Sequence, residues 1–316
     1  MRLRDDFVAV KVPATSANLG PGFDSMGLAL DLWDEVSVHA TTGATSVVVE
    51  GEGAGNVEQG EDNLVVRALR LALDRVGAPQ VGVRMHCTNR IPHSRGLGSS
   101  ASAIVAGVTL TRALIGDADV LGRREILEIG SQMEGHPDNV APAVFGGATV
   151  SWMNDETSEV GCVRLTPPEG ISPVAFIPDF ELRTAAARAA LPATVPHGDA
   201  SFNVARGALL AAVLSGNAQA GGGADLHALL MEATRDRLHQ EQRRAVMEPS
   251  LALVDWLRGA GFAAVVSGAG PTVLSLESVG ADICRDAAAA GWRVVPMGVA
   301  PQGAQITRGS LSKVEF

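Results

Sequence analysis

The sequence has 316 residues, of which 46% are hydrophobic and 19% charged, a composition typical of a folded protein and unlike that of a disordered chain. A chain of this length exceeds the usual size of one domain, so two lobes are expected. The formal net charge of -10 argues against a nucleic-acid-binding protein, because such proteins need a basic surface to displace counterions from phosphates.

Cysteine usage and the N-terminus favour a cytoplasmic protein. Cys87, Cys162 and Cys284 are odd in number, far apart and without a C-x-x-C pair, so neither a disulfide framework nor a zinc site is expected. Residues 1–10 carry four charged side chains and lack the apolar stretch of a signal peptide. The longest apolar run, residues 101–115, is interrupted by polar residues and too short to cross a membrane.

The pattern of apolar and turn-forming residues predicts strands and helices that alternate along the chain. The expected elements are, in chain order, strands at 8–12 and 47–50, a helix at 63–76, helices at 100–114 and 123–134, strands at 144–153 and 174–177, helices at 203–214 and 224–231, and strands at 263–267 and 272–276. The first helix is predicted from Leu64, Ala68 and Leu71 at helical spacing. This alternation indicates a mixed α and β protein.

Two polar or glycine-rich segments divide the chain. Residues 155–170 are polar and include Pro167-Pro168, which places the boundary between an N-terminal lobe at 1–166 and a C-terminal lobe at 167–316. The three glycines at 221–223 separate two predicted helices and indicate a flexible joint.

A glycine- and serine-rich segment precedes the helix predicted at 100–114. It reads Pro92, His93, Ser94, Arg95, Gly96, Leu97, Gly98, Ser99, Ser100, Ala101 and Ser102. Two glycines allow the backbone to approach a ligand closely, and the free N–H groups at a helix start attract an anion. The alternative is an ordinary tight turn capped by Ser99 or Ser100.

The same segment excludes two common phosphate-binding designs. It differs from G-x-x-x-x-G-K-[ST], and no lysine lies near it, so neither a Walker-type loop nor the lysine of protein kinases is present. A phosphate here would therefore be held by backbone dipoles, serine hydroxyls, Arg95 and a metal ion.

Three further segments carry polar or glycine residues where ligands often bind. Residues 13–24, which follow the first strand, contain Asn18 and Asp24, although a connecting loop with an Asx turn explains them as well. Glu128 could bind Mg²⁺, but taken alone it is better explained as a solvated helix residue. His136, Asp138 and Asn139 form a polar cluster beyond the end of that helix. Residues 267–272 join two strands through a glycine turn that either connects them or closes a nucleotide pocket.

Together and in this order, four strings resemble the motifs of the GHMP kinases. They are PATSANLGPGFD, PHSRGLGSSASA, GHPDNVAPAVFGG and SGAGPT, and the first and third closely resemble those of the homoserine kinases in that superfamily. The resemblance covers essentially the whole chain. It implies an α+β, two-lobed GHMP kinase fold with an N-lobe like domain 2 of ribosomal protein S5 and a ferredoxin-like C-lobe. The implied reaction transfers phosphate from ATP to L-homoserine, giving O-phospho-L-homoserine for threonine biosynthesis.

The resemblance also implies roles for individual residues. ATP would bind residues 92–102, and Mg²⁺ would bind Ser99 or Ser100 together with Glu128. L-homoserine would contact a set of six residues: Asn18, Asp24, His136, Asn139, Arg188 and Arg243. The two arginines suit the substrate carboxylate, because guanidinium pairs with carboxylate through two hydrogen bonds. The family commonly has Pro-Tyr before the second arginine where this chain has Glu241-Gln242, so Arg244 is the alternative.

Phosphoryl transfer needs positioning and charge neutralisation, which the loop, Mg²⁺ and Arg95 would supply. Asp138 would accept the hydroxyl proton or orient the hydroxyl, and the proton could instead pass to the γ-phosphate. Three alternative functions remain: a GHMP kinase for another alcohol, an inactive ligand sensor, and a nucleic-acid binder, which the acidic charge opposes. No nucleic-acid or membrane partner is expected, and a homodimer is expected only because it is the commonest assembly.

Overall fold

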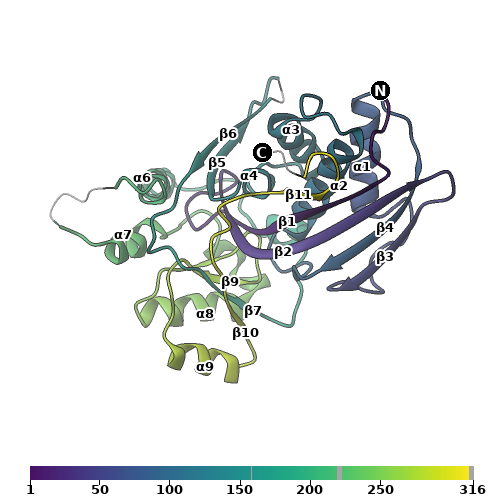
Figure 1. The fold of residues 1–316 in the computed structure, drawn as a ribbon. Helices are drawn as coiled ribbons and strands as arrows, with labels where there is room; N and C mark the ends of the chain where they lie inside the picture. The colour runs from purple at the N-terminus through teal and green to yellow at the C-terminus, as the bar shows by residue number, and fades with distance from the viewer. Residues whose placement is uncertain (158, 219–222, 313–316) are drawn as a thin grey trace.

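A computed structural model describes residues 1–157, 159–218 and 223–312, and within these the strands form two sheets (Figure 1). The larger sheet contains β1 (Phe7–Ala17), β2 (Met26–Thr41), β3 (Ser46–Gly51), β4 (Gly82–Asn89), β5 (Ala148–Met153), β6 (Val160–Leu165) and β11 (Gln305–Arg308). Its main strand order is β11-β1-β2-β4-β3. The observed mixture of sheets and helices confirms the predicted class.

The long strand β2 organises the larger sheet. It pairs with β1 along most of its length, with β4 over its C-terminal half, and with β5 through Met26–Leu28. The β1–β2 register shifts between Pro13 and Ala14. After this shift, the last residues of β1 pair with the N-terminal part of β2, which does not pair with β4. Strand β6 extends the branch through β5, and β3 is parallel to β4.

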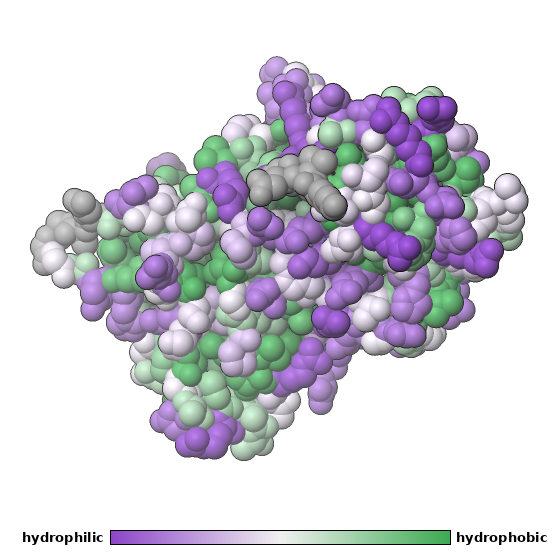
Figure 2. Space-filling model, viewed as in Figure 1, coloured by the Kyte–Doolittle hydropathy of each residue, from purple (hydrophilic) through white to green (hydrophobic). Residues whose placement is uncertain are grey.

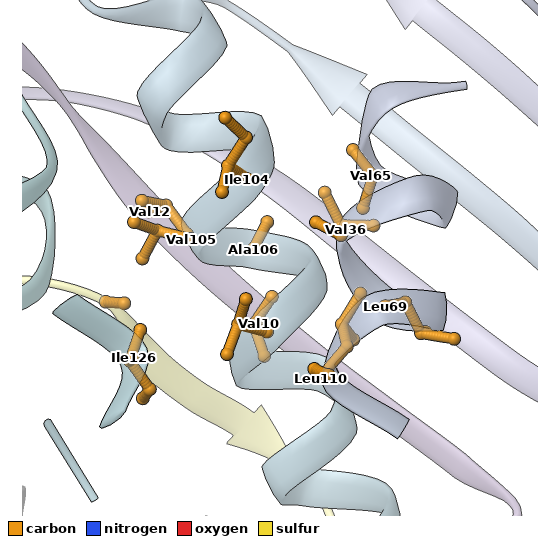
Figure 3. Packing of buried hydrophobic residues seen from close by; sticks show 14 of the residues in the cluster. Val10, Val12, Val36, Val65, Leu69, Ile104, Val105, Ala106, Leu110 and Ile126 are labelled. Atoms are coloured by element: carbon orange, nitrogen blue, oxygen red, sulfur yellow. The ribbon is translucent and has the colours of Figure 1, made fainter. Parts of the chain in front are cut away.

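Helices cover one face of this sheet (Figure 1). They are α1 (Leu64–Arg75), α2 (Ser99–Ile115), α3 (Arg123–Glu134) and α4 (Val140–Phe145). Helix α2 is apolar on nearly every side and buried over most of its length, so it forms the centre of the core. Figure 3 shows Ile104, Val105 and Leu110 of α2 among valines of β1 and β2 and residues of α1 and α3.

The smaller sheet has the order β10-β7-β9-β8, with every pair antiparallel. Its strands are β7 (Val174–Ile177), β8 (Ala264–Val266), β9 (Val273–Ser275) and β10 (Arg293–Pro296). The accompanying helices are α5 (Thr184–Ala189), α6 (His197–Leu214), α7 (Leu226–Ala233), the short 3-10 helix η1 (Glu241–Val246), α8 (Glu248–Gly259) and α9 (Ala281–Ala289).

Several predicted boundaries differ from the structure. The strand predicted from residue 144 begins at Ala148, because Val144 lies in the short helix α4. Leu71 was expected on the apolar face of α1 but is exposed, and neighbouring Leu69 and Ala72 are buried instead. Strand β2 was not predicted, and of the joint predicted at 221–223 the first two residues lie outside the described residues.

The predicted lobe boundary between residues 166 and 167 stays a prediction. The smaller sheet begins at β7, after that boundary, but the chain later returns to the larger sheet, where β11 pairs with β1. In the described parts of the chain, no helix has both the length and the apolar character needed to span a bilayer. Figure 2 shows hydrophobic residues interspersed with hydrophilic ones over the face it presents.

Close packing of α1 on α2 depends on Gly107. A Cβ atom there would lie 2.4 Å from the Val65 carbonyl oxygen of α1, whereas one at Gly207 in α6 would meet only the Pro21 carbonyl oxygen at 3.7 Å. We expect Gly107→Ala to lower the free energy of unfolding by about 1–3 kcal/mol. The matched Gly207→Ala should be neutral or stabilising by up to about 1 kcal/mol. Urea unfolding of both variants checks this, and equal effects would contradict it.

Candidate active site

The glycine-rich segment forms an uncapped helix start. Helix α2 begins at Ser99, Gly98 before it has φ 69°, and no side chain caps the first turn. The alternative of a turn capped by Ser99 or Ser100 is therefore wrong, because both serines lie inside the helix. Ser94 and Gly96 also have positive φ values of 54° and 74°. This winding leaves the N–H groups of the first turn available to an anion.

Two neighbours approach this loop so closely that only glycine fits. A Cβ atom on Gly96 would lie 2.2 Å from the Ser267 carbonyl oxygen, and one on Gly98 would lie 1.9 Å from Thr15 Oγ1. The Ser267 hydroxyl donates to the Gly96 carbonyl over 2.6 Å and lies 2.8 Å from the hydroxyl of Ser16. The loop is thus held between the end of β1 and the turn after β8.

The segments singled out in the sequence meet around one polar cavity of about 160 Å³. The predicted residues that line it are Asn18, Asp24, Ser94, Gly96, Gly98, Ser99, Ser100, His136, Asp138, Asn139, Arg188 and Arg243. Glu134, Leu182, Arg183, Thr184, Gly268 and Ala269 also line it and were not predicted as site residues. Residues from the N-terminal and the C-terminal parts of the chain therefore line the same cavity.

Asn18 fixes one wall of this cavity. Its backbone has φ 67°, its Nδ2 donates to the Gly268 carbonyl over 2.8 Å, and its Oδ1 accepts from the Asp24 N–H over 2.9 Å. Asp24 in turn pairs with Arg188 through two hydrogen bonds of 2.7 and 3.0 Å. Both ends of the Asn18 amide are therefore used to place Asp24 and to tie the two lobes together.

His136 and Asp138 form a buried pair at another wall. His136 Nδ1 lies 2.6 Å from Asp138 Oδ1, and the Asp138 side chain is 2% exposed. Burial lowers the pKa of His136, but the hydrogen bond and the charge of Asp138 outweigh it and raise the pKa above its ordinary value. Asn139 Oδ1 accepts from the Thr15 hydroxyl over 2.8 Å, which joins this wall to β1.

Arg243, and not Arg244, reaches the cavity. Arg243 is 1% exposed, and its pKa is lowered mainly by burial. Among the described residues, no carboxylate forms an ion pair with it within 4 Å, although the charges of Asp24, Asp236 and Asp138 act on it from farther away. Arg244 instead pairs on the surface with Glu241 and Asp255. A buried guanidinium without a carboxylate in ion-pair distance is suited to contact an anionic group.

The carboxylate beside the loop is Glu134 rather than Glu128. Ser100 Oγ donates to Glu134 Oε2 over 2.7 Å, and both residues line the cavity. Glu128 pairs with Arg124 on the same helix and lines neither cavity described here. The expectation that Glu128 binds a metal ion stays a prediction, but in this structure α3 brings its last residue, Glu134, and not Glu128, to the loop. The sequence feature that could have indicated Glu134 is its position directly before Gly135 and His136.

Arg95 points away from the cavity. Its guanidinium donates to the carbonyls of Pro178, Asp179 and His93 at 2.6–3.0 Å and contacts Glu181 at 3.2 Å. This differs from the expectation that Arg95 neutralises the transferred phosphate, because carbonyl groups after β7 take its nitrogens. Arg95 instead joins the loop to the C-terminal part of the chain.

A second cavity of about 360 Å³ lies on the other side of the loop and was not predicted. Its lining includes apolar residues of β2, β3 and α1 and polar residues between 56 and 63, and it shares Ser94, Ser99 and Ser100 with the first cavity. His93 and Ser102 also line it. Asp34 in its wall has a pKa raised to about 6, mainly by burial, although two backbone N–H groups oppose the shift.

The second cavity left no signal in the sequence because its walls come from segments far apart in the chain. Of the other predicted loop residues, Pro92, Leu97 and Ala101 are buried, and the Ser102 hydroxyl donates to the Pro13 carbonyl. In the described ranges, no group of three or more His, Cys, Asp or Glu side chains could hold a metal ion. Ser100 and Glu134 nevertheless suit Mg²⁺, which takes one or two carboxylates and completes its shell with phosphates and water.

Comparisons with known proteins agree with this geometry. The model of the GHMP kinases N terminal domain matches residues 63–147, and that of the GHMP kinases C terminal domain matches residues 210–290. Homoserine kinase from Streptomyces coelicolor is 44% identical over 95% of this chain and 94% of that protein. Homoserine kinase from Corynebacterium kroppenstedtii is 45% identical over 93% of each chain.

The solved structures give the same answer for the fold. The crystal structure of homoserine kinase from Cytophaga hutchinsonii superposes with a TM-score of 0.81 at 24% identity, over 96% of this chain and 98% of that one. The predicted two-lobed GHMP kinase fold is therefore confirmed. With four motifs around one cavity, two family models and relatives that match nearly end to end, this chain belongs to the homoserine kinases of the GHMP kinase superfamily.

Proposed function

We infer that this chain transfers the terminal phosphoryl group of ATP to the side-chain hydroxyl of L-homoserine, giving ADP and O-phospho-L-homoserine. One observation carries the inference: the two cavities meet at Ser94, Ser99 and Ser100, at the uncapped start of α2. A nucleotide in the larger cavity would place its phosphates over this helix start. An alcohol in the smaller cavity would face them from the other side.

The nucleotide side of the site relies on backbone groups. The N–H groups of the first turn of α2, in which Ser99 and Ser100 lie, supply fixed dipoles for phosphate oxygens, as expected for a helix N-terminus. The nucleoside would occupy the larger cavity among residues of β2 and α1. Bound Mg²⁺ would neutralise phosphate charge, and Ser100 and Glu134 are the residues that would hold it.

The substrate side suits an amino acid. A free amino acid carries an ammonium and a carboxylate, and this cavity offers the carboxylate of Asp24 and the guanidinium groups of Arg188 and Arg243. We propose that the substrate separates the Asp24–Arg188 pair, with its ammonium at Asp24 and its carboxylate between the two arginines. Asn18 keeps Asp24 in place, and Asn139 lines the same cavity.

The roles proposed for Asp138 and His136 concern orientation. Asp138 is buried beside His136, and its Oδ1 lies 2.6 Å from His136 Nδ1, so one carboxylate oxygen already has a partner. Phosphoryl transfer requires positioning more than proton removal. Asp138 would therefore accept a hydrogen bond from the substrate hydroxyl and orient it, and the hydroxyl proton would pass to the transferred phosphoryl group. A homodimer and a cytoplasmic location stay predictions.

A coupled assay of ADP release tests the function directly. We expect ADP release that depends on L-homoserine, Mg²⁺ and ATP, with much lower rates for L-serine, mevalonate and galactose. L-serine is one methylene shorter than homoserine, so its hydroxyl would not reach the same position. Mevalonate and galactose lack the α-amino group that Asp24 would bind. Release that depends on mevalonate or galactose and not on homoserine would contradict the inference, as would binding of ATP and homoserine without turnover.

The metal assignment predicts different behaviour for two glutamates of α3. Glu134→Gln should raise the Mg²⁺ concentration needed for half-maximal activity about tenfold or more, because a carboxylate ligand is lost. Glu128→Gln, the matched control on the same helix, should leave that concentration unchanged. Titration of activity with Mg²⁺ at saturating ATP and homoserine measures both. A shift confined to the Glu128 variant would restore the assignment drawn from the sequence alone.

Asp138→Asn separates an orienting role from a base. We expect the KM for homoserine to rise and kcat to fall by less than about tenfold, because the amide can still hold the hydroxyl in place. A general base typically contributes about 100-fold or more to kcat. A decrease of that size at unchanged KM would identify Asp138 as the proton acceptor, against the role proposed here.

A further inference from the structure

His239 lies behind the substrate cavity, between α7 and η1, and has no exposed surface. Its Nε2 lies 2.7 Å from the Gly20 carbonyl oxygen, and its Nδ1 lies 3.1 Å from Nη1 of Arg243. Its ring stacks on Phe23 with centroids 5.0 Å apart and an angle of 29° between the planes. The imidazole therefore connects the loop after β1 with the arginine that faces the cavity.

These two contacts allow only one protonation state. A carbonyl oxygen can only accept, so Nε2 must carry the hydrogen that reaches Gly20. A guanidinium can only donate, so Nδ1 must be bare to receive the hydrogen of Arg243. His239 is thus the neutral Nε2–H tautomer, and a proton added at Nδ1 would set two donors against each other.

The surrounding charges are consistent with the neutral form. Burial is the largest influence and lowers the pKa of His239; Asp236 raises it, and Arg243 lowers it further. Asp236 Oδ2 lies 3.8 Å from Nε2, but this carboxylate already accepts from a side-chain amide and from three backbone N–H groups. The Arg188 guanidinium lies 5.9 Å from the centre of the Phe23 ring and forms its own ion pair with Asp24.

The hydrogen bond that Arg243 donates to His239 helps to set the direction of the Arg243 guanidinium. Arg243 Nε donates to the Ala187 carbonyl over 3.2 Å, and Nη1 is shared between His239 and, at 3.4 Å, the Gly268 carbonyl. Within the described ranges, Nη2 has no hydrogen-bond partner. Three protein acceptors thus hold Nε and Nη1, and Nη2 can donate to a ligand in the cavity.

We propose that His239 is a positioning residue for substrate binding: as a neutral hydrogen-bond acceptor it holds Arg243 in the orientation that presents Nη2 to the substrate carboxylate. The proposal rests on the proposed function, in which Arg243 receives that carboxylate. It assigns to His239 an effect on homoserine binding and none on ATP binding, because the ring touches the substrate cavity's walls and not the nucleotide cavity.

Two substitutions separate the two hydrogen bonds of the ring. His239→Asn places an amide oxygen near the position of Nδ1 and can still accept from Arg243. His239→Gln places its amide near the position of Nε2 and can still donate to Gly20, but leaves Nη1 without this acceptor. We expect the KM for homoserine to rise about tenfold in His239→Gln and to stay within about threefold of wild type in His239→Asn. The KM for ATP and kcat should change little in either.

The controls distinguish this role from general destabilisation. His227→Gln, at an exposed histidine paired with Glu277, should leave both KM values unchanged. Equal homoserine KM values in the two His239 variants would overturn the proposal, as would parallel losses in kcat and in the KM for ATP. Absence of homoserine-dependent ADP release by the wild type would instead refute the proposed function, so the two failures can be told apart.

The wild-type protein provides a test that needs no substitution. Nitrogen-15 NMR of the histidine side chains at neutral pH should show His239 as the neutral tautomer with hydrogen on Nε2; a charged ring or hydrogen on Nδ1 would overturn the proposal. Toward acid pH, protonation of Nδ1 should raise the KM for homoserine. This rise should be smaller in His239→Asn, since His136 titrates in both proteins; identical pH profiles would contradict the proposal.

Discussion

The site depends on one close contact, in which the loop before α2 lies directly against the turn after β8. Gly96 has no side chain to prevent this approach, and the Ser267 hydroxyl fixes it through the Gly96 carbonyl, while Gly98 leaves room for Thr15 of β1 on the other neighbouring segment. Asn18 spans the same junction by donating to Gly268. Because the contact joins residues about 170 and 250 positions apart, it brings the helix start of one lobe to the side chains of the other.

Electrostatics in the cavity differ from those of the whole chain. The protein carries a net charge of -10, yet the cavity contains a buried arginine that forms no ion pair within 4 Å among the described residues, and an ion pair that a zwitterion could separate. Such an arrangement costs folding free energy, since an unpaired buried charge is poorly solvated. Hydrogen bonds from Arg243 to three protein acceptors offset part of this cost and keep the guanidinium ready for an anion.

Individual residues show where prediction from sequence succeeded and where it failed. The start of α2 was predictable because Gly98 followed by serines and an apolar run is a local signal. Glu134 and Glu128 lie on one helix, and only the packing of α3 against the loop decides which approaches Ser100. Arg95 was expected to bind phosphate, but its guanidinium donates hydrogen bonds to the carbonyl groups that follow β7. The larger cavity combines residues of β2, β3, β4, α1 and α2 with loop residues, and no local pattern in the sequence indicated it.

The family, the mixed α and β class, the anion-binding helix start and the motifs that surround the substrate cavity could all be inferred from the amino-acid sequence. These follow from local chemistry: glycine and serine before an apolar helix, and polar residues at the ends of strands. Tertiary packing sets which of two adjacent arginines, Arg243 or Arg244, faces the cavity, and which glutamate lies beside the loop. The direction of a side chain depends on packing between elements that are distant in the sequence, and composition and spacing do not contain that information.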